Sequence, residues 1–157
     1  MLRRPIESAA RSGHNPTRCL ITASTWIGTY NAGINRIVGK EIKPITTEHG
    51  LSNNAVLSLY EDEDGVVWVG TYGGGLNRIE GNEITVYTTK EGLFNDNVVQ
   101  ILEDGNGYLW ISCNRGLFRL NKRELNEFAR GETEKIHSIV STQMYKLILF
   151  QIQIFLY

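Results

Sequence analysis

Hydrophobic and polar positions alternate along this chain in short runs that glycine-containing segments separate. In the clearest stretch, Ala55 to Glu61 and Val66 to Thr71 carry apolar side chains on both parities, as strands covered on both faces do. Residues Glu83 to Thr89 instead alternate between polar and apolar positions, which is typical of a half-solvated strand. The pattern predicts two inner strands and one outer strand, with burial falling from first to last.

Turn residues complete this unit. Asp62 to Gly65, Tyr72 to Gly75, and Gly81 with Asn82 provide the Asp-Gly, Gly-Gly and Gly-Asn chemistry of hairpins, whose central residues need positive φ. A third strand, Leu76 to Glu80, lies between the last two of these turns. The unit is therefore predicted to be a four-stranded antiparallel meander.

The same unit recurs along the chain. Trp26, Trp68 and Trp110 are spaced 42 residues apart, and the segments that begin at the first two tryptophans are identical at about 20 of 42 aligned positions. A third, more diverged copy runs to about Phe128 and is one residue shorter at its glycine turn, so that Arg119 corresponds to Arg78. The chain is a tandem repeat.

A repeat of 42 residues with four antiparallel strands is typical of a β-propeller blade. Leucine-rich and β-helical solenoids repeat at about 20 to 29 residues or fewer, and helical repeats would show a 3.6-residue apolar period, which we do not find. The predicted fold class is all-β, a partial β-propeller of four-stranded antiparallel blades. Residues 25–140 would hold about three blades, incomplete at both ends, with Lys135 to Val140 as a further inner strand.

The two ends of the chain do not match the repeat. Residues 1–24 carry several arginines without the apolar run of a secretory signal. Residues 141–157 end in an apolar run, Leu147 to Tyr157, which has only 11 residues and is broken by Gln151 and Gln153, about half of what spans a bilayer. Propellers close with about 4 to 8 blades, so we expect a truncated or frame-disrupted piece of a longer protein. The alternative is a short subunit that completes a ring with other copies. In both cases uncovered blade faces predict self-association.

Composition narrows the range of partners. The net charge of -1 argues against a nucleic-acid-binding domain, which normally has a basic face. Cys19 and Cys113 cannot form a disulfide framework, and the histidines at 14, 49 and 137 lie in unlike contexts. No metal site, cofactor or catalytic residue is predicted.

Two stretches carry a family resemblance: GLSNNAVLSLYEDEDGVVWVGTYGGGLNRI, residues 50–79, and GLFNDNVVQILEDGNGYLWISCNRGLFRL, residues 92–120. They resemble the two-component regulator propeller repeat in the Gly-Leu-x-Asn start, the Glu-Asp-x-x-Gly turn, the Trp-x-Gly-Thr strand and the glycine turn. The resemblance implies a sensor propeller, usually periplasmic, joined through a further β domain and a transmembrane helix to a histidine kinase or another signalling output.

The function implied by this resemblance is non-catalytic sensing of a ligand or partner within a two-component signal transduction regulator. One alternative is a piece of a propeller enzyme, such as a lyase or glycosidase, which would need convergent His, Glu or Arg residues. The other is a protein-interaction scaffold. Periplasmic location follows from the resemblance alone, and a chain expressed as written would stay in the cytoplasm. The ligand, the number of blades and the output domain are left open.

Most distinctive positions have a structural interpretation. The tryptophans recur with a small residue two places later, which predicts packing between blades, and the Asp and Gly positions predict hairpin turns. These structural repeat positions are Trp26, Trp68, Trp110, Gly28, Gly70, Asp62, Gly65, Asp104 and Gly107.

One end of the blades is a candidate recognition face. The turn between the second and third strands and the connection to the next blade emerge at the same end, where rings can stack on a saccharide and amides can hydrogen-bond to it. A small molecule such as a saccharide, or a partner protein domain, would bind there. The alternative is that the polar residues only cap turns. The candidates are Tyr30, Tyr72, Asn53, Asn54, Asn95 and Asp96.

The acidic run from Glu61 to Gly65 predicts a hairpin turn in preference to a calcium loop. Thermal unfolding in millimolar calcium and in chelator should therefore coincide, because only a ligand of the native state raises the melting temperature. Differential scanning fluorimetry provides the measurement. A rise of several degrees in calcium would establish an ion site.

Overall fold

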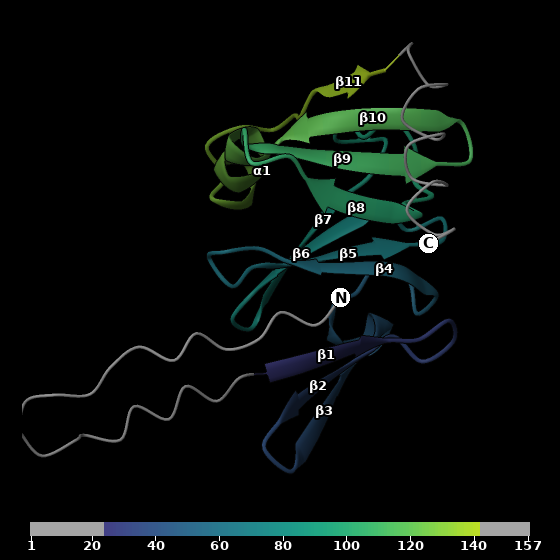
Figure 1. The fold of residues 1–157 in the computed structure, drawn as a ribbon, viewed down its shortest axis with the longest axis vertical. Helices are drawn as coiled ribbons and strands as arrows, with labels where there is room; N and C mark the ends of the chain where they lie inside the picture. Colours follow the sequence, from purple (N-terminus) through teal and green to yellow (C-terminus); the bar gives the residue numbers. More distant parts are fainter. Residues whose placement is uncertain (1–23, 142–157) are drawn as a thin grey trace, which may run out of the picture.

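Three antiparallel sheets follow one another along the chain in the computed structural model, which describes residues 24–141 (Figure 1). The end segments predicted not to match the repeat lie outside the described residues, apart from Ser24 and Ser141. Each sheet is a meander in which strands adjacent in sequence are paired. The predicted all-β propeller class is confirmed, with blade-like sheets of three or four strands and one α-helix.

The strands are short and similar in length. The first sheet holds β1 (Ser24–Gly28), β2 (Ile34–Val38) and β3 (Glu41–Ile45), and a 3-10 turn, η1 (Thr47–His49), follows it. The second sheet holds β4 (Val56–Glu61), β5 (Val67–Thr71), β6 (Leu76–Glu80) and β7 (Glu83–Tyr87). The third holds β8 (Gln100–Glu103), β9 (Tyr108–Cys113), β10 (Gly116–Asn121) and β11 (Ser138–Val140). The four strands predicted for the second unit are confirmed to within two residues.

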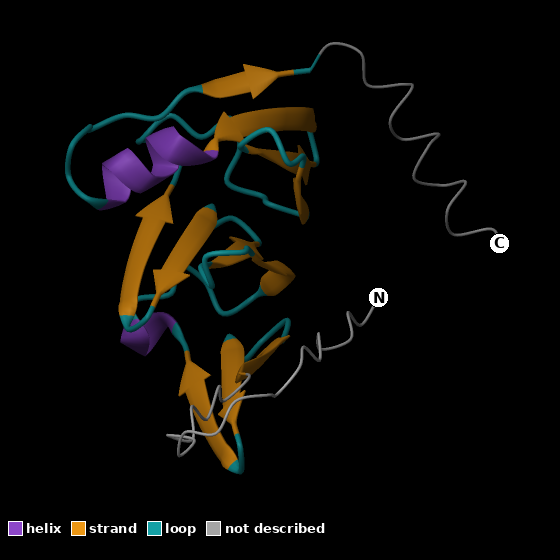
Figure 2. Ribbon diagram, turned by 60° about the vertical axis from the view of Figure 1, so that its left-hand side comes forward, coloured by secondary structure: helices purple, strands orange, loops and turns teal. Residues whose placement is uncertain are grey.

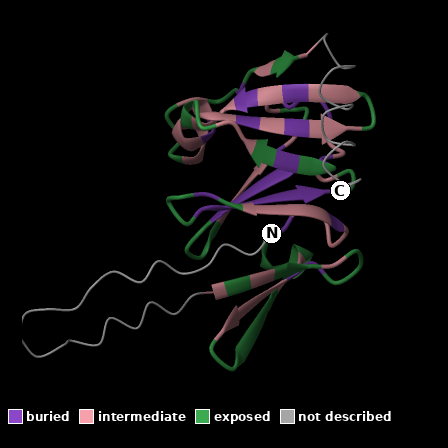
Figure 3. Cartoon of the chain, in the orientation of Figure 1, coloured by how far each residue is buried: buried purple, intermediate pink, exposed green. Residues whose placement is uncertain are grey.

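Burial within the second sheet differs from the predicted gradient. The second strand, β5, is buried at every position, and β6 is buried at all but its last, whereas the first strand, β4, is mostly half-buried (Figure 3). The prediction that burial falls steadily from the first strand was wrong. The reason is that β4 lies at an edge of its sheet, where only one strand flanks it.

The end of the third unit also differs from its prediction. Lys135 to Val140 was predicted to start an inner strand, but Ser138–Val140 forms β11, the outer strand paired with β10. Helix α1 (Lys122–Ala129) separates β10 from β11 in the sequence (Figure 2). In the second sheet, the equivalent connection is the two-residue Gly81-Asn82 turn. Asn121 caps this helix by accepting a hydrogen bond from the Arg123 N–H. Because the helix is inserted before it, the fourth strand begins later in the sequence than in the second unit. Its position therefore resembled the start of a new unit.

The core lies between the sheets. The apolar cluster between the first two sheets includes Val67 and Val69 of β5, while Trp68 of the same strand belongs to the cluster between the second and third sheets. Alternate residues of one strand therefore serve two interfaces, as the double-sided apolar pattern predicted.

Two glycines set the spacing of neighbouring sheets. A Cβ on Gly28 would lie 2.7 Å from Cγ1 of Val56, and one on Gly70 would lie 2.5 Å from the carbonyl oxygen of Val98. Val56 and Val98 are equivalent residues of successive repeats. The glycine two places after Trp26 and after Trp68 thus leaves room for the next sheet to approach.

Within the described residues, none of the helices is long and apolar enough to cross a bilayer.

The burial of Trp68 predicts its energetic role. Its side chain is 0% exposed and its ring stacks on Tyr87 at a centroid distance of 6.4 Å. Replacing Trp68 by Ala should reduce the free energy of unfolding by about 3 to 5 kcal/mol, because it removes apolar burial and leaves a cavity. Urea denaturation followed by circular dichroism measures this loss. Trp26→Ala is the matched comparison and should cost less, because Trp26 is only half-buried.

Candidate functional site

The turn between the first two strands of the second sheet encloses a buried carboxylate. Asp62 Oδ1 accepts hydrogen bonds from the backbone N–H groups of Asp64 and Val66, and Oδ2 accepts one from Trp68 Nε1 at 3.0 Å. Gly65 provides the positive φ of 78° that the turn requires. The side chain of Asp62 therefore joins the turn to the buried tryptophan of the next strand.

The third sheet repeats this arrangement. Asp104 Oδ2 accepts a hydrogen bond from Trp110 Nε1 at 3.0 Å, and Oδ1 accepts from the N–H groups of Asn106 and Tyr108. In the first repeat the equivalent position is Leu20, which has no acceptor. Among the described residues, the buried Nε1 of Trp26 has no hydrogen-bond partner. The Asp and Trp positions predicted as structural are therefore partners within one blade.

An arginine lies over each tryptophan. Arg36, Arg78 and Arg119 stand opposite Trp26, Trp68 and Trp110 in the strand register. Each guanidinium carbon lies 5.2 to 5.9 Å from its ring centroid, within cation–π range.

Lys122 joins the second and third sheets through an ion-pair network. Its Nζ lies 2.9 Å from Asp62 Oδ2 and 3.1 Å from Glu103 Oε1. Tyr60 donates to Glu103 Oε2 at 2.8 Å. One ammonium thus neutralises two carboxylates from neighbouring sheets, which sequence reasoning missed because these residues are far apart in the chain.

This network shifts the ionisation of its members. Burial by itself would raise the pKa of Asp62, but the hydrogen bonds from Trp68 and Lys122 hold that pKa below its usual value. Burial, together with the hydrogen bond to Glu103, raises the pKa of Tyr60 to about 12. The carboxylates are engaged in holding two blades together. Within the described range, no three His, Cys, Asp or Glu side chains are arranged to hold a metal ion.

The predicted recognition residues lie on turns and connections at the other end of the sheets. Tyr30 and Tyr72 follow β1 and β5, the strands that carry Trp26 and Trp68 in neighbouring sheets, and are 60% and 57% exposed. The N–H of Tyr72 donates to the carbonyl of Ala55, which ties its turn to the connection that precedes β4.

The amide and acid candidates make local hydrogen bonds. Asn53 Nδ2 donates to the carbonyl of Tyr72, and Asn54 Oδ1 accepts from the N–H of Thr47. Asp96 accepts from the N–H and hydroxyl of Thr89. Asn95 is 8% exposed and accepts from the N–H of Asn97. These side chains cap turns, so the two tyrosines are the most exposed of the six candidates.

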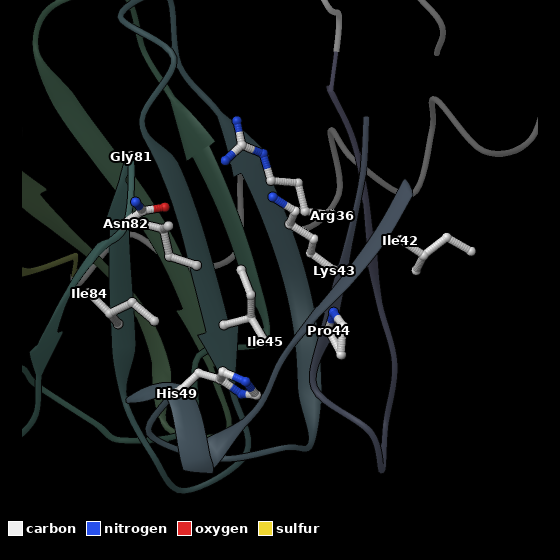
Figure 4. A pocket seen from close by; sticks show the side chains of 10 residues that line it. Arg36, Ile42, Lys43, Pro44, Ile45, His49, Gly81, Asn82 and Ile84 are labelled. Atoms are coloured by element: carbon white, nitrogen blue, oxygen red, sulfur yellow. The ribbon is translucent and has the colours of Figure 1, made fainter. Parts of the chain in front are cut away.

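A groove of about 520 Å³ lies on the outer side of the first two sheets (Figure 4). The first sheet and the segment after it supply three basic side chains, Arg36, Lys43 and His49, and the floor is apolar. None of the described residues that line this groove carries a carboxylate. Sequence reasoning missed it because its walls come from separate repeats. The lining residues are Arg36, Ile42, Lys43, Pro44, Ile45, His49, Ile79, Gly81, Asn82 and Ile84.

Comparison with protein families identifies the repeated segments. The model of the two component regulator propeller matches residues 50–73 and 92–115. Both segments are similar to the two-component regulator propeller repeat. Each match runs from the connection before the inner strand, through the turn that contains Asp62 or Asp104, to just beyond the tryptophan strand. No curated protein matches the chain.

The two-component regulator propeller repeat should depend on its buried carboxylate. Asp62→Asn should lower the free energy of unfolding at pH 7 by roughly 1 to 3 kcal/mol, because it weakens hydrogen bonds to Trp68 and Lys122. The folded-state pKa of Asp62 lies below its reference value of 3.8. Its charge therefore stabilises the fold above about pH 4, and this stabilisation is lost as the pH falls through the folded-state pKa.

The difference between the native protein and Asp62→Asn should accordingly shrink below pH 4. Urea midpoints at pH 7 and pH 3 measure it. Asp64→Asn is the control in the same turn, since the Asp64 side chain is 78% exposed, and it should change stability by less than about 0.5 kcal/mol. Equal losses for both variants would show that the buried hydrogen bonds are not the source.

Proposed function

We propose that this chain is part of the sensor propeller of a two-component signal transduction regulator, and that it binds a ligand without catalysing a reaction. The observation that carries the proposal is the pair of exposed tyrosines, Tyr30 and Tyr72, at equivalent turns of neighbouring blades. The two-component regulator propeller match gives the signalling context. Attachment to a histidine kinase and a periplasmic location belong to the proposal by resemblance.

The tyrosine face is suited to saccharides. Aromatic rings stack on the apolar faces of sugars, and exposed loops on a rigid sheet scaffold are common places for binding residues. The turns that carry both rings are held by hydrogen bonds, such as those from Gly33 N–H to the carbonyl of Asn54 and from Gly75 N–H to the carbonyl of Asp96. This pre-organisation reduces the entropy that binding would cost.

The chemistry of the acidic residues favours binding over catalysis. Asp62 and Glu103 share the ammonium of Lys122, and Asp104 accepts three hydrogen bonds within its own turn. Carboxylates occupied in this way by hydrogen bonds and ion pairs are poorly placed to act as general acids. A lyase or glycosidase remains the enzymatic alternative, and a protein-interaction scaffold the other.

Titration with neutral trisaccharides tests the proposal. Maltotriose, cellotriose and xylotriose serve as probes, and nitrogen–proton correlation spectra report on the backbone around both turns. We expect one of them to shift the resonances of the turns that contain Tyr30 and Tyr72. Tyr72→Ala should abolish these shifts while changing the free energy of unfolding by no more than about 0.5 kcal/mol, because the ring is exposed.

The control is Asn114→Ala, which changes the equivalent turn position of the third sheet and should leave the shifts unchanged. Absence of shifts with all three probes would refute saccharide recognition. A destabilisation by Tyr72→Ala as large as that of Trp68→Ala would show that Tyr72 is a packing residue.

A further inference from the structure

The gap between the second and third sheets is closed on its outer side by helix α1. Leu125 of the helix is fully buried, its carbonyl accepts a hydrogen bond from the Tyr87 hydroxyl at 2.7 Å, and Phe128 packs on the Tyr87 ring at 5.2 Å. Asn126 Oδ1 accepts from Arg78 Nε at 2.9 Å. The helix therefore contributes one apolar anchor, one aromatic anchor and two hydrogen-bond acceptors to the outer side of the second sheet.

The corresponding gap between the first and second sheets has no such helix in the described part of the chain. Arg36 and Ile45 are the residues of the first repeat that correspond to Arg78 and Tyr87, and both line the open groove. Across the groove the chain makes the short Gly81-Asn82 turn at the point where the third sheet leads into α1. The groove is thus the place that α1 fills in the next interface.

The groove also lacks the acceptor that α1 supplies. Arg78 Nε bonds to Asn126, whereas the equivalent Arg36 Nε is buried without a hydrogen-bond partner among the described residues. A buried donor without an acceptor is costly, and a docked group that supplied one would recover that cost.

The charge of the groove indicates the sign of its occupant. Its two cationic side chains are Arg36 and Lys43, and the nearest acidic contact of Lys43 Nζ is the exposed Glu41 at 3.9 Å. Residues 1–25 and 136–157 of this chain are both net positive, so neither end complements a basic groove. An acidic segment of another polypeptide does.

We propose that this groove docks a short, acidic, amphipathic helix of a partner protein, in the position that α1 occupies at the next interface. The partner helix would place an apolar residue over the Ile45 and Ile84 floor and an acceptor on Arg36. Carboxylates on its flank would face Lys43. This site is distinct from the tyrosine face, so either proposal can fail without the other.

A peptide based on α1 provides the probe. It repeats residues 121–131 with Lys122→Glu and Arg123→Glu, which gives it the required acidic flank, and a side-chain crosslink on its solvent face keeps it helical, since so short a helix is marginal in water. Fluorescence polarisation of the labelled peptide against the full chain measures its affinity. A crosslinked peptide of the same composition in scrambled order is the first control.

Charge-reversal variants distinguish docking of the peptide in the groove from non-specific attraction between the acidic peptide and any lysine of the surface. Lys43→Glu should weaken peptide binding by about tenfold or more, and Arg36→Ala should do the same by removing the donor. Lys40→Glu is the matched control, because Lys40 is an exposed residue of the turn after β2 and does not line the groove. It should change the affinity by less than about twofold. Because Arg36 also lies over Trp26, the exposed Lys43 gives the variant that leaves the fold intact.

Three results would overturn the proposal. The first is equal affinity for the designed and scrambled peptides, and the second is an equal loss of affinity for Lys40→Glu and Lys43→Glu. The third is binding of benzoate or of a peptide of residues 1–23 at the groove with no binding of the designed helix, which would assign a small carboxylate or the chain's own end as occupant.

Discussion

The close approach of each sheet to the next is the constraint on which this structure depends. Gly28 and Gly70 leave space for Val56 and Val98, which are equivalent residues of successive repeats. At Gly70, where backbone stands opposite, a side chain would force neighbouring sheets apart and open the apolar clusters between them. Packing therefore explains why the same glycine stands in the first two repeats of this chain.

The tryptophan two places before each of these glycines lies in the interface that the glycine makes possible. Trp68 is contacted on its polar edge and on its ring. Asp62 accepts a hydrogen bond from its indole nitrogen, Arg78 lies over the ring, and Tyr87 stacks against it. The ion pair from Lys122 to Asp62 then joins this unit to the third sheet. In the first repeat the equivalent unit lacks its aspartate and its covering tyrosine, and Trp26 is correspondingly less buried.

The two interfaces between sheets therefore differ although their sequences are related. Helix α1 closes the interface between the second and third sheets and accepts hydrogen bonds from Arg78 and Tyr87. At the interface between the first and second sheets, the equivalent Arg36 and Ile45 line a basic groove. The tyrosine turns lie at the opposite end of the sheets from the acidic turns, so ligand and partner sites can be separate on this scaffold. The proposed sensor role needs such an arrangement, because one surface must receive a signal and another must pass it on.

The sequence alone determined the repeat, the strand meander and the double-sided burial of β5, because turn chemistry and apolar parity are local properties that Asp62, Gly65 and Trp68 express within a few residues. It did not reveal α1, since the helix interrupts the repeat, although Asn121 followed by Leu125 and Phe128 carries a cap and an i,i+3 apolar pair. The Lys122 network and the groove were decided only by the tertiary structure. Both join residues of different repeats, and no local pattern specifies which side chains meet when two sheets pack face to face.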